Sequence, residues 1–374
     1  MDKALQSGRL HYMDHLRALA MLAGVLFHAA LAYSPLMQPF FPTADRQSSP
    51  LVDVFVWLPH LLRMPLFFTV SGFFAAWIIA HRGPTGLLRQ RIRRIALPFI
   101  VAWPLVFLAM SAATTWAANH VQHPSPLLRL IHDWQANPDA PSLPPTTAHL
   151  WFLYYLLLFG ILHWIARTLD FAAPGRWLLR HSPGLLLLGL PLLLTLALAS
   201  VSAPHPAPEG LLPQFWAILF YGAFFAFGAL LYGQPEWLER AKKLLWPLLA
   251  ACALCYPLFL WQLSMETPSI AAPTASWLVA LLEGCLAVWL TVASLLLGRR
   301  LLDRPSPIMR YLAQSAYWTY LLHLPLLLLV QYHLMDLSMA WEWKFLLATS
   351  VTIAVCLLSY QLLVRHTPLR RFVG

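Results

Sequence analysis

The first apolar segment, "HLRALAMLAGVLFH" (residues 15–28), decides the class of fold and carries two ionisable side chains, Arg17 and His28. A helix that crosses a bilayer needs about 20 apolar residues, and ionisable groups inside it are costly and usually functional. His28 lies eleven positions after Arg17. At about 100° per residue, both side chains share one helix face, about 16 Å apart along the axis. The segment predicts a membrane-spanning helix with two polar groups in line.

The composition extends this prediction to the whole chain. Of 374 residues, 59% are hydrophobic and 11% are charged, whereas soluble domains carry about 25% charged residues. Pro-rich polar stretches such as "ANPDAPSLPPTT" mark loops between apolar runs. We therefore expect an all-α integral membrane protein with one polytopic domain (residues 1–374). Ten transmembrane helices are predicted, at about 16–36, 55–80, 95–118, 147–167, 184–202, 213–233, 244–264, 275–297, 311–333 and 343–363.

The basic residues predict the orientation of these helices. The chain has a net charge of +10, and with the N-terminus inside the cell all but four of its 25 Lys and Arg residues fall on the cytoplasmic side. Basic loops stay in the cytoplasm, so both termini are predicted there. The basic excess is an orientation signal and does not indicate a nucleic-acid partner. The four exceptions are Arg46, Arg63, Arg129 and Lys344.

The cysteines do not predict a metal site. All four lie in apolar runs, and the pair Cys252 and Cys255 has no second pair or nearby histidine to complete a site. We expect them to be packing residues, and no metal-ligand spacing appears elsewhere.

Two histidines are expected near the middle of the membrane. His28 and His323 each stand twelve residues above the predicted start of a helix that rises from the cytoplasm, at Leu16 and Tyr311 respectively. A buried histidine is often structural. However, histidine is also the natural proton-transfer group, because its unperturbed pKa is about 6.5. The shared depth favours a catalytic role for both.

Two further stretches offer polar side chains: Arg63 and His149 are expected in the outer part of the membrane, and Ser71 lies deeper. "RMPLFFTVSGFF" (63–74) holds Arg63 and Ser71, and "HLWFLYYLL" (149–157) holds His149 and Trp151. We expect these residues at an acyl or acceptor site. The alternatives are close helix packing for Ser71 and Gly72, snorkelling for Arg63, and an aromatic belt for Trp151.

The basic stretch "RQRIRRIALP" (89–98) is predicted to bind the donor. Arg91 and Arg94 lie three residues apart at a helix start and would grip phosphates together with Arg17. Contact with anionic lipid is the alternative. We also expect Glu283, in "LLEGCLAVW" (281–289), at the acyl or acceptor site. It lies inside the eighth predicted helix, so it needs a partner that the sequence does not identify.

Together these motifs resemble the membrane-bound acyltransferase 3 family. The resemblance rests on the Arg17-x10-His28 spacing, "FFTVSGF", "RIRRIALP", "HLWFL" and "YLLHLP", in this order over residues 11–365. Within the family, the chain looks most similar to the glucans biosynthesis succinyltransferases, which modify osmoregulated periplasmic glucans. His28 matches the family's essential histidine, and Arg17 matches its paired arginine.

The resemblance implies an O-acyltransferase of the bacterial inner membrane. A cytoplasmic acyl-CoA, with succinyl-CoA favoured, would serve as co-substrate and donate its acyl group to a periplasmic glucan hydroxyl. No permanently bound cofactor is expected. An alternative is acetylation of another envelope glycan. A proton-coupled or anion transporter, with a relay through His28, His323, Glu283 and Arg63, is another, although no internal repeat supports it.

Overall fold

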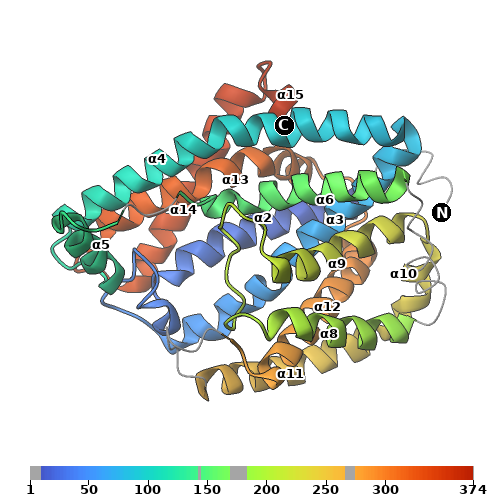
Figure 1. Cartoon of the computed structure of the whole chain (residues 1–374), viewed down its shortest axis with the longest axis horizontal. Coiled ribbons are helices and arrows are strands. Elements are labelled where there is room, and N and C mark those ends of the chain that lie inside the picture. The colour runs from blue at the N-terminus through green and yellow to red at the C-terminus, as the bar shows by residue number, and fades with distance from the viewer. Residues whose placement is uncertain (1–9, 142–144, 169–182, 266–273, 374) are drawn as a thin grey trace. The chain divides into compact units, whose positions relative to one another are not determined.

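Helices form all the regular structure that the computed structural model describes (Figure 1). The described residues are 10–141, 145–168, 183–265 and 274–373. Within these ranges there are no strands. An all-α fold is therefore confirmed for this part of the chain.

The chain divides into two compact units, each built from three segments. Unit 1 comprises Met1–Ala20, Leu61–Ala96 and Trp151–Ala313. Unit 2 comprises Met21–His60, Leu97–Leu150 and Gln314–Gly374. The prediction of a single domain over residues 1–374 stays a prediction.

Long apolar helices make up most of both units. They are joined by short helical turns at Pro35–Met37, Ile92–Ala96, Ala148–Leu150, Lys242–Leu244 and Tyr360–Val364. The helices are α2 (His11–Leu31), α3 (Pro50–Arg91), α4 (Leu97–His120), α5 (Pro126–Ala136), α6 (Trp151–Thr168), α8 (Pro183–Leu198), α9 (Phe215–Tyr232), α10 (Glu236–Ala241), α11 (Leu245–Met265), α12 (Trp277–Leu301), α13 (Pro307–Leu334), α14 (Trp341–Ser359) and α15 (Arg370–Val373).

Each of the ten predicted ranges overlaps one of these long helices. By length and apolar composition, the described residues contain 7 segments able to cross a membrane. One of them, Pro50–His120, includes both α3 and α4. The apolar helix α8 is too short to be counted, and α13 is not among the seven. The chain is therefore a multi-pass helical protein, while ten crossings and cytoplasmic termini stay predictions.

The predicted end of the first helix, at about residue 36, is wrong, because α2 ends at Leu31. Ser34 then caps a short turn: its hydroxyl oxygen accepts a hydrogen bond from the Met37 N–H at 3.2 Å. The same hydroxyl donates to the Asp53 carboxylate. A serine with these bonds stabilises the start of a new turn, which the apolar pattern alone does not reveal.

The helix α3 contains a break close to the predicted end of the second membrane span. Gly83 has φ 70° and ψ 173°, outside the helical region. Glycine adopts a positive φ at little cost, and Pro84 after it has no N–H to donate. The break separates the apolar part of α3 from the basic stretch that ends at Arg91.

In unit 1, a proline in α8 creates a bonding site for α12. Pro191 has no N–H, so the Leu187 carbonyl one turn earlier lacks its helical donor. The Trp289 indole N–H of α12 donates to that carbonyl at 2.9 Å. The two helices are thereby joined by a polar contact inside an otherwise apolar interface.

Two glycines bring α3 and α9 of unit 1 into backbone contact. A Cβ built on Gly228 would lie 1.8 Å from the Thr69 carbonyl oxygen, and one on Gly72 would lie 1.9 Å from the Phe225 carbonyl oxygen. Small residues allow this close approach of membrane helices. The packing interpretation of the Ser71–Gly72 pair is therefore correct for Gly72.

We expect Gly228→Ala to destabilise the protein by about 1–3 kcal/mol, because the added methyl group forces the α3 and α9 backbones apart. Gly189→Ala is the matched control, since a Cβ there meets no described atom within 4 Å. Thermal unfolding of the detergent-solubilised variants measures both effects. Equal melting temperatures for Gly228→Ala and Gly189→Ala would contradict the close helix contact.

In unit 2, a buried ion pair holds the segment that follows α2. The Lys344 ammonium of α14 donates to the Asp45 carboxylate at 2.6 Å and to the Met335 carbonyl at 3.3 Å. Both charged side chains are almost fully buried, at 2% and 4% exposure. The Asp45 N–H donates to the Ala32 carbonyl at 2.8 Å. This network fixes the chain just beyond the helix that carries His28.

Candidate functional site

Three histidines of unit 2 form a cluster. The ring of His28 on α2 lies 5.4 Å from the ring of His323 on α13, measured between centroids. His149, in the turn Ala148–Leu150, lies 5.2 Å from His323 on the same measure. His323 and His149 are buried, and His28 is partly exposed. Three residues predicted from separate motifs therefore lie together.

The hydrogen bonds of His323 define which of its ring nitrogens carries a proton. Its Nδ1 lies 3.1 Å from the Thr319 carbonyl oxygen and 2.9 Å from that of Tyr320. Carbonyl oxygens only accept hydrogen bonds, so Nδ1 is the donor. In the neutral ring the lone pair is then on Nε2. His323 is thus held in the tautomer that can accept a proton at Nε2.

A buried amide supports α2 beside His28. The Gln331 side chain of α13 donates to the Ala29 carbonyl at 2.9 Å and accepts from the Thr43 hydroxyl at 2.8 Å. Both polar ends of the amide are therefore engaged. These bonds fix the backbone of the residue that follows His28.

Arg17 lies on the same uninterrupted helix as His28, as the sequence predicted. Within unit 1, its guanidinium donates to the Ala313 carbonyl at 3.0 Å and lies 3.6 Å from the Asp14 carboxylate. The side chain is 39% exposed. Arg17 is therefore anchored by the start of α13 and keeps access to a ligand.

The two other predicted donor-binding arginines have different surroundings. Arg91 is buried in unit 1, where its guanidinium donates to the Ser71 carbonyl at 3.5 Å. A Cβ on Gly160 of α6 would lie 3.0 Å from Arg91, so α6 packs closely against it. Arg94 is exposed and lies in the π-helical turn Ile92–Ala96. Such turns are frequent at functional sites.

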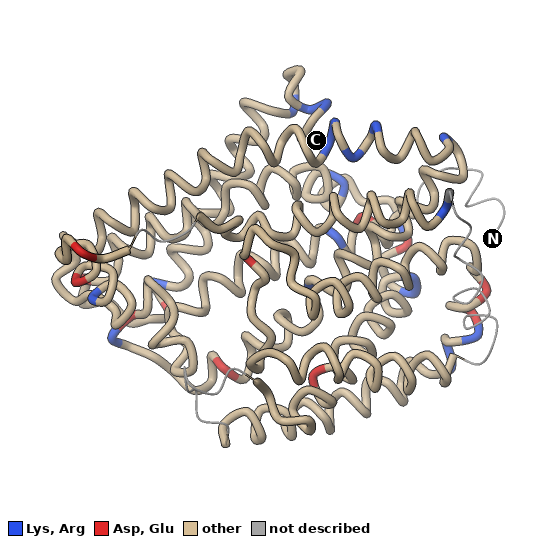
Figure 2. The backbone as a smooth tube through the Cα atoms, viewed as in Figure 1, with Lys and Arg blue, Asp and Glu red and all other residues tan. Residues whose placement is uncertain are grey.

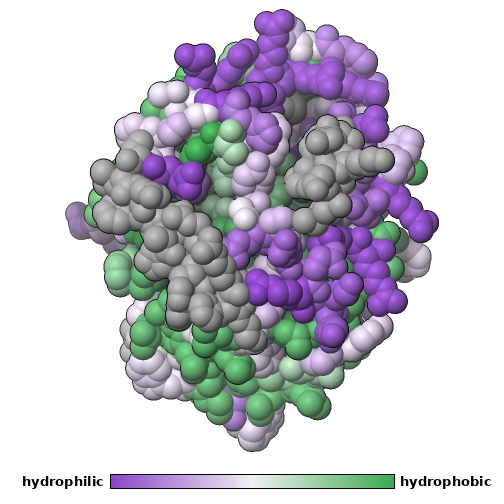
Figure 3. All heavy atoms as spheres, turned by 90° about the vertical axis from the view of Figure 1, so that its right-hand side faces the viewer, coloured by the Kyte–Doolittle hydropathy of each residue, from purple (hydrophilic) through white to green (hydrophobic). Residues whose placement is uncertain are grey.

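Basic residues recur near these arginines. Figure 2 marks several of them along the final part of α3 and around α10. Hydrophilic side chains gather in the upper and right-hand parts of the face drawn in Figure 3, and hydrophobic ones gather toward its lower edge.

Arg63 and Trp151 lie in unit 1 around Tyr221 of α9. Arg63 is partly buried and lies within electrostatic reach of the Tyr221 hydroxyl. The ring of Trp151 lies 5.1 Å from that of Tyr221 and 6.3 Å from that of Phe68. Trp151 is buried, unlike a residue of a lipid-facing aromatic belt.

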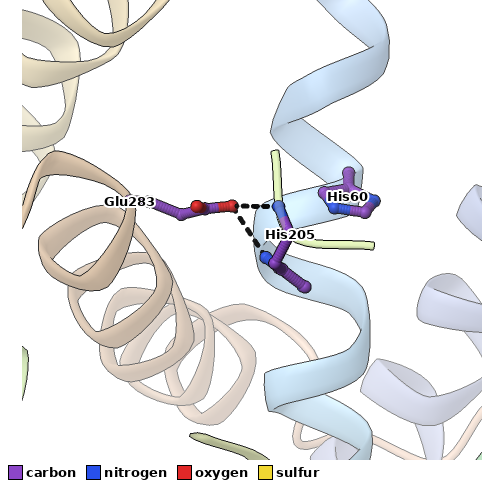
Figure 4. A group of neighbouring side chains, drawn as sticks. All are labelled: His60, His205 and Glu283. Atoms are coloured by element: carbon purple, nitrogen blue, oxygen red, sulfur yellow. Dashed lines mark hydrogen bonds and ion pairs between the residues drawn. The ribbon is translucent and has the colours of Figure 1, made fainter. Parts of the chain in front are cut away.

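Glu283 of α12 has a partner that the sequence did not identify. One oxygen of its carboxylate accepts from His205 twice, from Nδ1 at 2.7 Å and from the backbone N–H at 2.9 Å (Figure 4). Both side chains are 1% exposed. A buried carboxylate is stabilised by such donors, so this pair fixes the loop between α8 and α9.

His205 was missed because it lies in the proline-rich loop "SAPHPAPEG" (202–210). A loop residue shares no helical periodicity with Glu283, so spacing does not connect the two. The available signal was a lone acid in an apolar helix, together with a histidine in the loop between two other apolar helices.

Comparison with known proteins identifies the family. Residues 10–361 match the family model of the acyltransferase 3 family, described as an acyltransferase domain. The chain belongs to the acyltransferase 3 family. It is therefore an acyltransferase enzyme and a multi-pass membrane protein, and the resemblance seen in the sequence motifs is confirmed.

Similar proteins of this acyltransferase family share a name that refers to glucans. The chain is 23% identical to glucans biosynthesis protein C of Salmonella paratyphi B, over 98% of this chain and 94% of the relative. Glucans biosynthesis protein C of Salmonella enteritidis PT4 and of Salmonella schwarzengrund show the same identity and coverage. No solved structure matches the chain.

Proposed function

We propose that this acyltransferase moves an acyl group, with succinyl favoured, from cytoplasmic acyl-CoA to a hydroxyl of a periplasmic glucan. The observation that carries the proposal is the histidine cluster around His28, on the same helix as Arg17, in a member of an acyltransferase family. The name of the relatives supports a glucan as acceptor. The enzyme would lie in the bacterial inner membrane with both termini in the cytoplasm.

In the proposed reaction, His28 is the general base. Its ring nitrogen takes the proton from a glucan hydroxyl, and the oxygen attacks the thioester carbonyl carbon. The C–S bond then breaks, and the CoA thiolate takes the proton from His28. The products are a glucan ester and free CoA. His323, whose ring lies 5.4 Å away, would assist by orienting His28.

The donor would be held by Arg17, Arg91 and Arg94. Arg91 supports this role because no acidic side chain of the described residues pairs with its buried guanidinium. A buried cation needs a counter-charge, and a phosphate supplies one. From Arg17 to His28 the helix rises about 16 Å, a length that an extended pantetheine arm can span.

Coenzyme A binding tests this function directly. We expect CoA or succinyl-CoA at 100 times its dissociation constant to stabilise the purified protein by about 2.7 kcal/mol, measured as a thermal shift. Arg17→Ala should need more ligand for the same shift, whereas the exposed Arg365→Ala should behave like wild type. A transporter would be indifferent to CoA, so an absent shift in the wild type would overturn the proposal.

Arg63 is our candidate for recognising the carboxylate at the far end of a succinyl group. A hydrogen bond between charged groups contributes about 1.5–3 kcal/mol, so Arg63→Leu should lower the ratio of succinyl to acetyl transfer by about 10- to 100-fold. The ratio is independent of how much variant protein folds. Equal loss with both donors would instead make Arg63 a structural or acceptor-site residue.

A further inference from the structure

The backbone before His149 is held in an unfavourable conformation. Ala148 has φ 47°, in the left-handed region that residues other than glycine seldom adopt. Two bonds stabilise the turn: the Ala148 N–H donates to the Thr146 hydroxyl at 3.2 Å, and the Trp103 indole donates to the Thr146 carbonyl at 2.8 Å. Such strain persists only where surrounding contacts enforce it, and it concentrates at functional sites.

Tyr320 of α13 fixes His149 from two directions. The Tyr320 hydroxyl donates to the His149 carbonyl at 2.5 Å, and the Tyr320 carbonyl accepts from His149 Nε2 at 3.0 Å. The carbonyl cannot donate, so Nε2 carries the proton and the lone pair of the neutral ring is on Nδ1. Both the position and the tautomer of His149 are therefore determined.

This arrangement leaves His149 Nδ1 buried without a hydrogen bond. The residue is 5% exposed, and within the described ranges no donor reaches Nδ1. A buried acceptor without a donor is costly and is uncommon in native proteins. The ring also lies 5.2 Å from His323, which is the neighbour of His28. A strained backbone, a fixed tautomer and an unsatisfied acceptor thus coincide beside the proposed base.

We propose that His149 Nδ1 accepts a hydrogen bond from a sugar hydroxyl next to the one that is acylated. This inference rests on the proposed function, in which the proton of the reacting hydroxyl goes to His28. His149 would then set which hydroxyl of the glucan faces the thioester. It is a specificity-determining residue for the acceptor and leaves donor binding to the arginines.

Two substitutions separate this role from a structural one. In His149→Gln the amide N–H extends to the position of Nε2, so the bond to the Tyr320 carbonyl is kept and the acceptor at Nδ1 is lost. In His149→Asn the amide oxygen lies near the position of Nδ1, so the acceptor is kept and the bond to Tyr320 is lost. The two variants therefore remove one function each.

The kinetics of the purified full-length variants give the first readout. We expect His149→Gln to raise KM for the glucan about 3- to 10-fold, as the loss of one neutral hydrogen bond predicts, with KM for succinyl-CoA unchanged. His149→Asn should have a KM for the glucan that is closer to the wild-type value than that of His149→Gln. The reverse order, or unchanged glucan KM in both variants, would overturn the proposal.

A spectroscopic readout on the wild type does not depend on turnover. In protein labelled with ¹⁵N-histidine, the Nδ1 resonance of His149, assigned by its absence in His149→Gln, should show an unprotonated nitrogen. It should move when a glucose oligosaccharide is added without acyl-CoA. An unmoved resonance at saturating oligosaccharide contradicts the proposed contact. A moved resonance in a protein that transfers no acyl group would refute the proposed function and leave the contact standing.

Discussion

Replacing His28 with alanine is expected to remove nearly all acyl transfer while acyl-CoA binding survives. General-base catalysis contributes about 10²–10⁴-fold to rate, and in the proposed reaction no other group takes the proton of the reacting hydroxyl. In the proposed function the donor is held by Arg17, Arg91 and Arg94, away from His28. Turnover with labelled succinyl-CoA measures the first effect, and the thermal shift with CoA measures the second.

The exposed His366→Ala is the control for this variant, and it should keep wild-type turnover. His323→Ala should give an intermediate loss, because His323 acts through His28 in the proposed reaction. Near-normal turnover of a folded His28→Ala protein would show that the general-base mechanism is wrong.

The largest expected loss of stability follows from removing Lys344. Its ammonium lies 2.6 Å from the Asp45 carboxylate, and both side chains are almost fully buried. Removing one member of a buried ion pair leaves the other charge unpaired and costs about 3–5 kcal/mol. We therefore expect Lys344→Ala to lower the free energy of unfolding by that amount, measured by chemical denaturation in detergent.

The double variant Asp45→Asn with Lys344→Met separates charge from packing. Replacing both partners by uncharged groups of similar size is often nearly neutral, so this variant should recover most of the lost stability. Lys243→Ala, at an exposed position, should have little effect. A Lys344→Ala protein as stable as Lys243→Ala would mean that the ion pair is not buried as described.

The helices, and the position of Arg17 and His28 on one helix face, were predictable because both depend on local sequence. An apolar run of membrane length forms a helix wherever it lies, since every backbone group must be bonded internally. The eleven-residue spacing then fixes the relative directions of the two side chains. The predicted end of the second span, at about residue 80, lies close to the break at Gly83 for the same reason, because glycine and proline act on their own segment.

Tertiary contacts decided what the sequence did not show. Arg91 belongs to a basic stretch that is predicted to bind the donor, but the stretch does not reveal that α6 packs against Arg91 at Gly160 and that the side chain is buried. His149 depends on a left-handed Ala148 and on Tyr320, a residue 171 positions away in sequence. No spacing rule relates residues that separate helices bring together.

The most direct test of the account uses proteoliposomes that contain the purified enzyme, with a glucan enclosed in the lumen and ¹⁴C-succinyl-CoA added outside. Molecules with their cytoplasmic side outward should transfer the label to the enclosed glucan as an alkali-labile ester, and empty liposomes should transfer none. We expect this transfer to be lost with His28→Ala. Label that never reaches the glucan in the wild type, under conditions in which the protein binds CoA, would contradict acyl transfer across the membrane to a glucan.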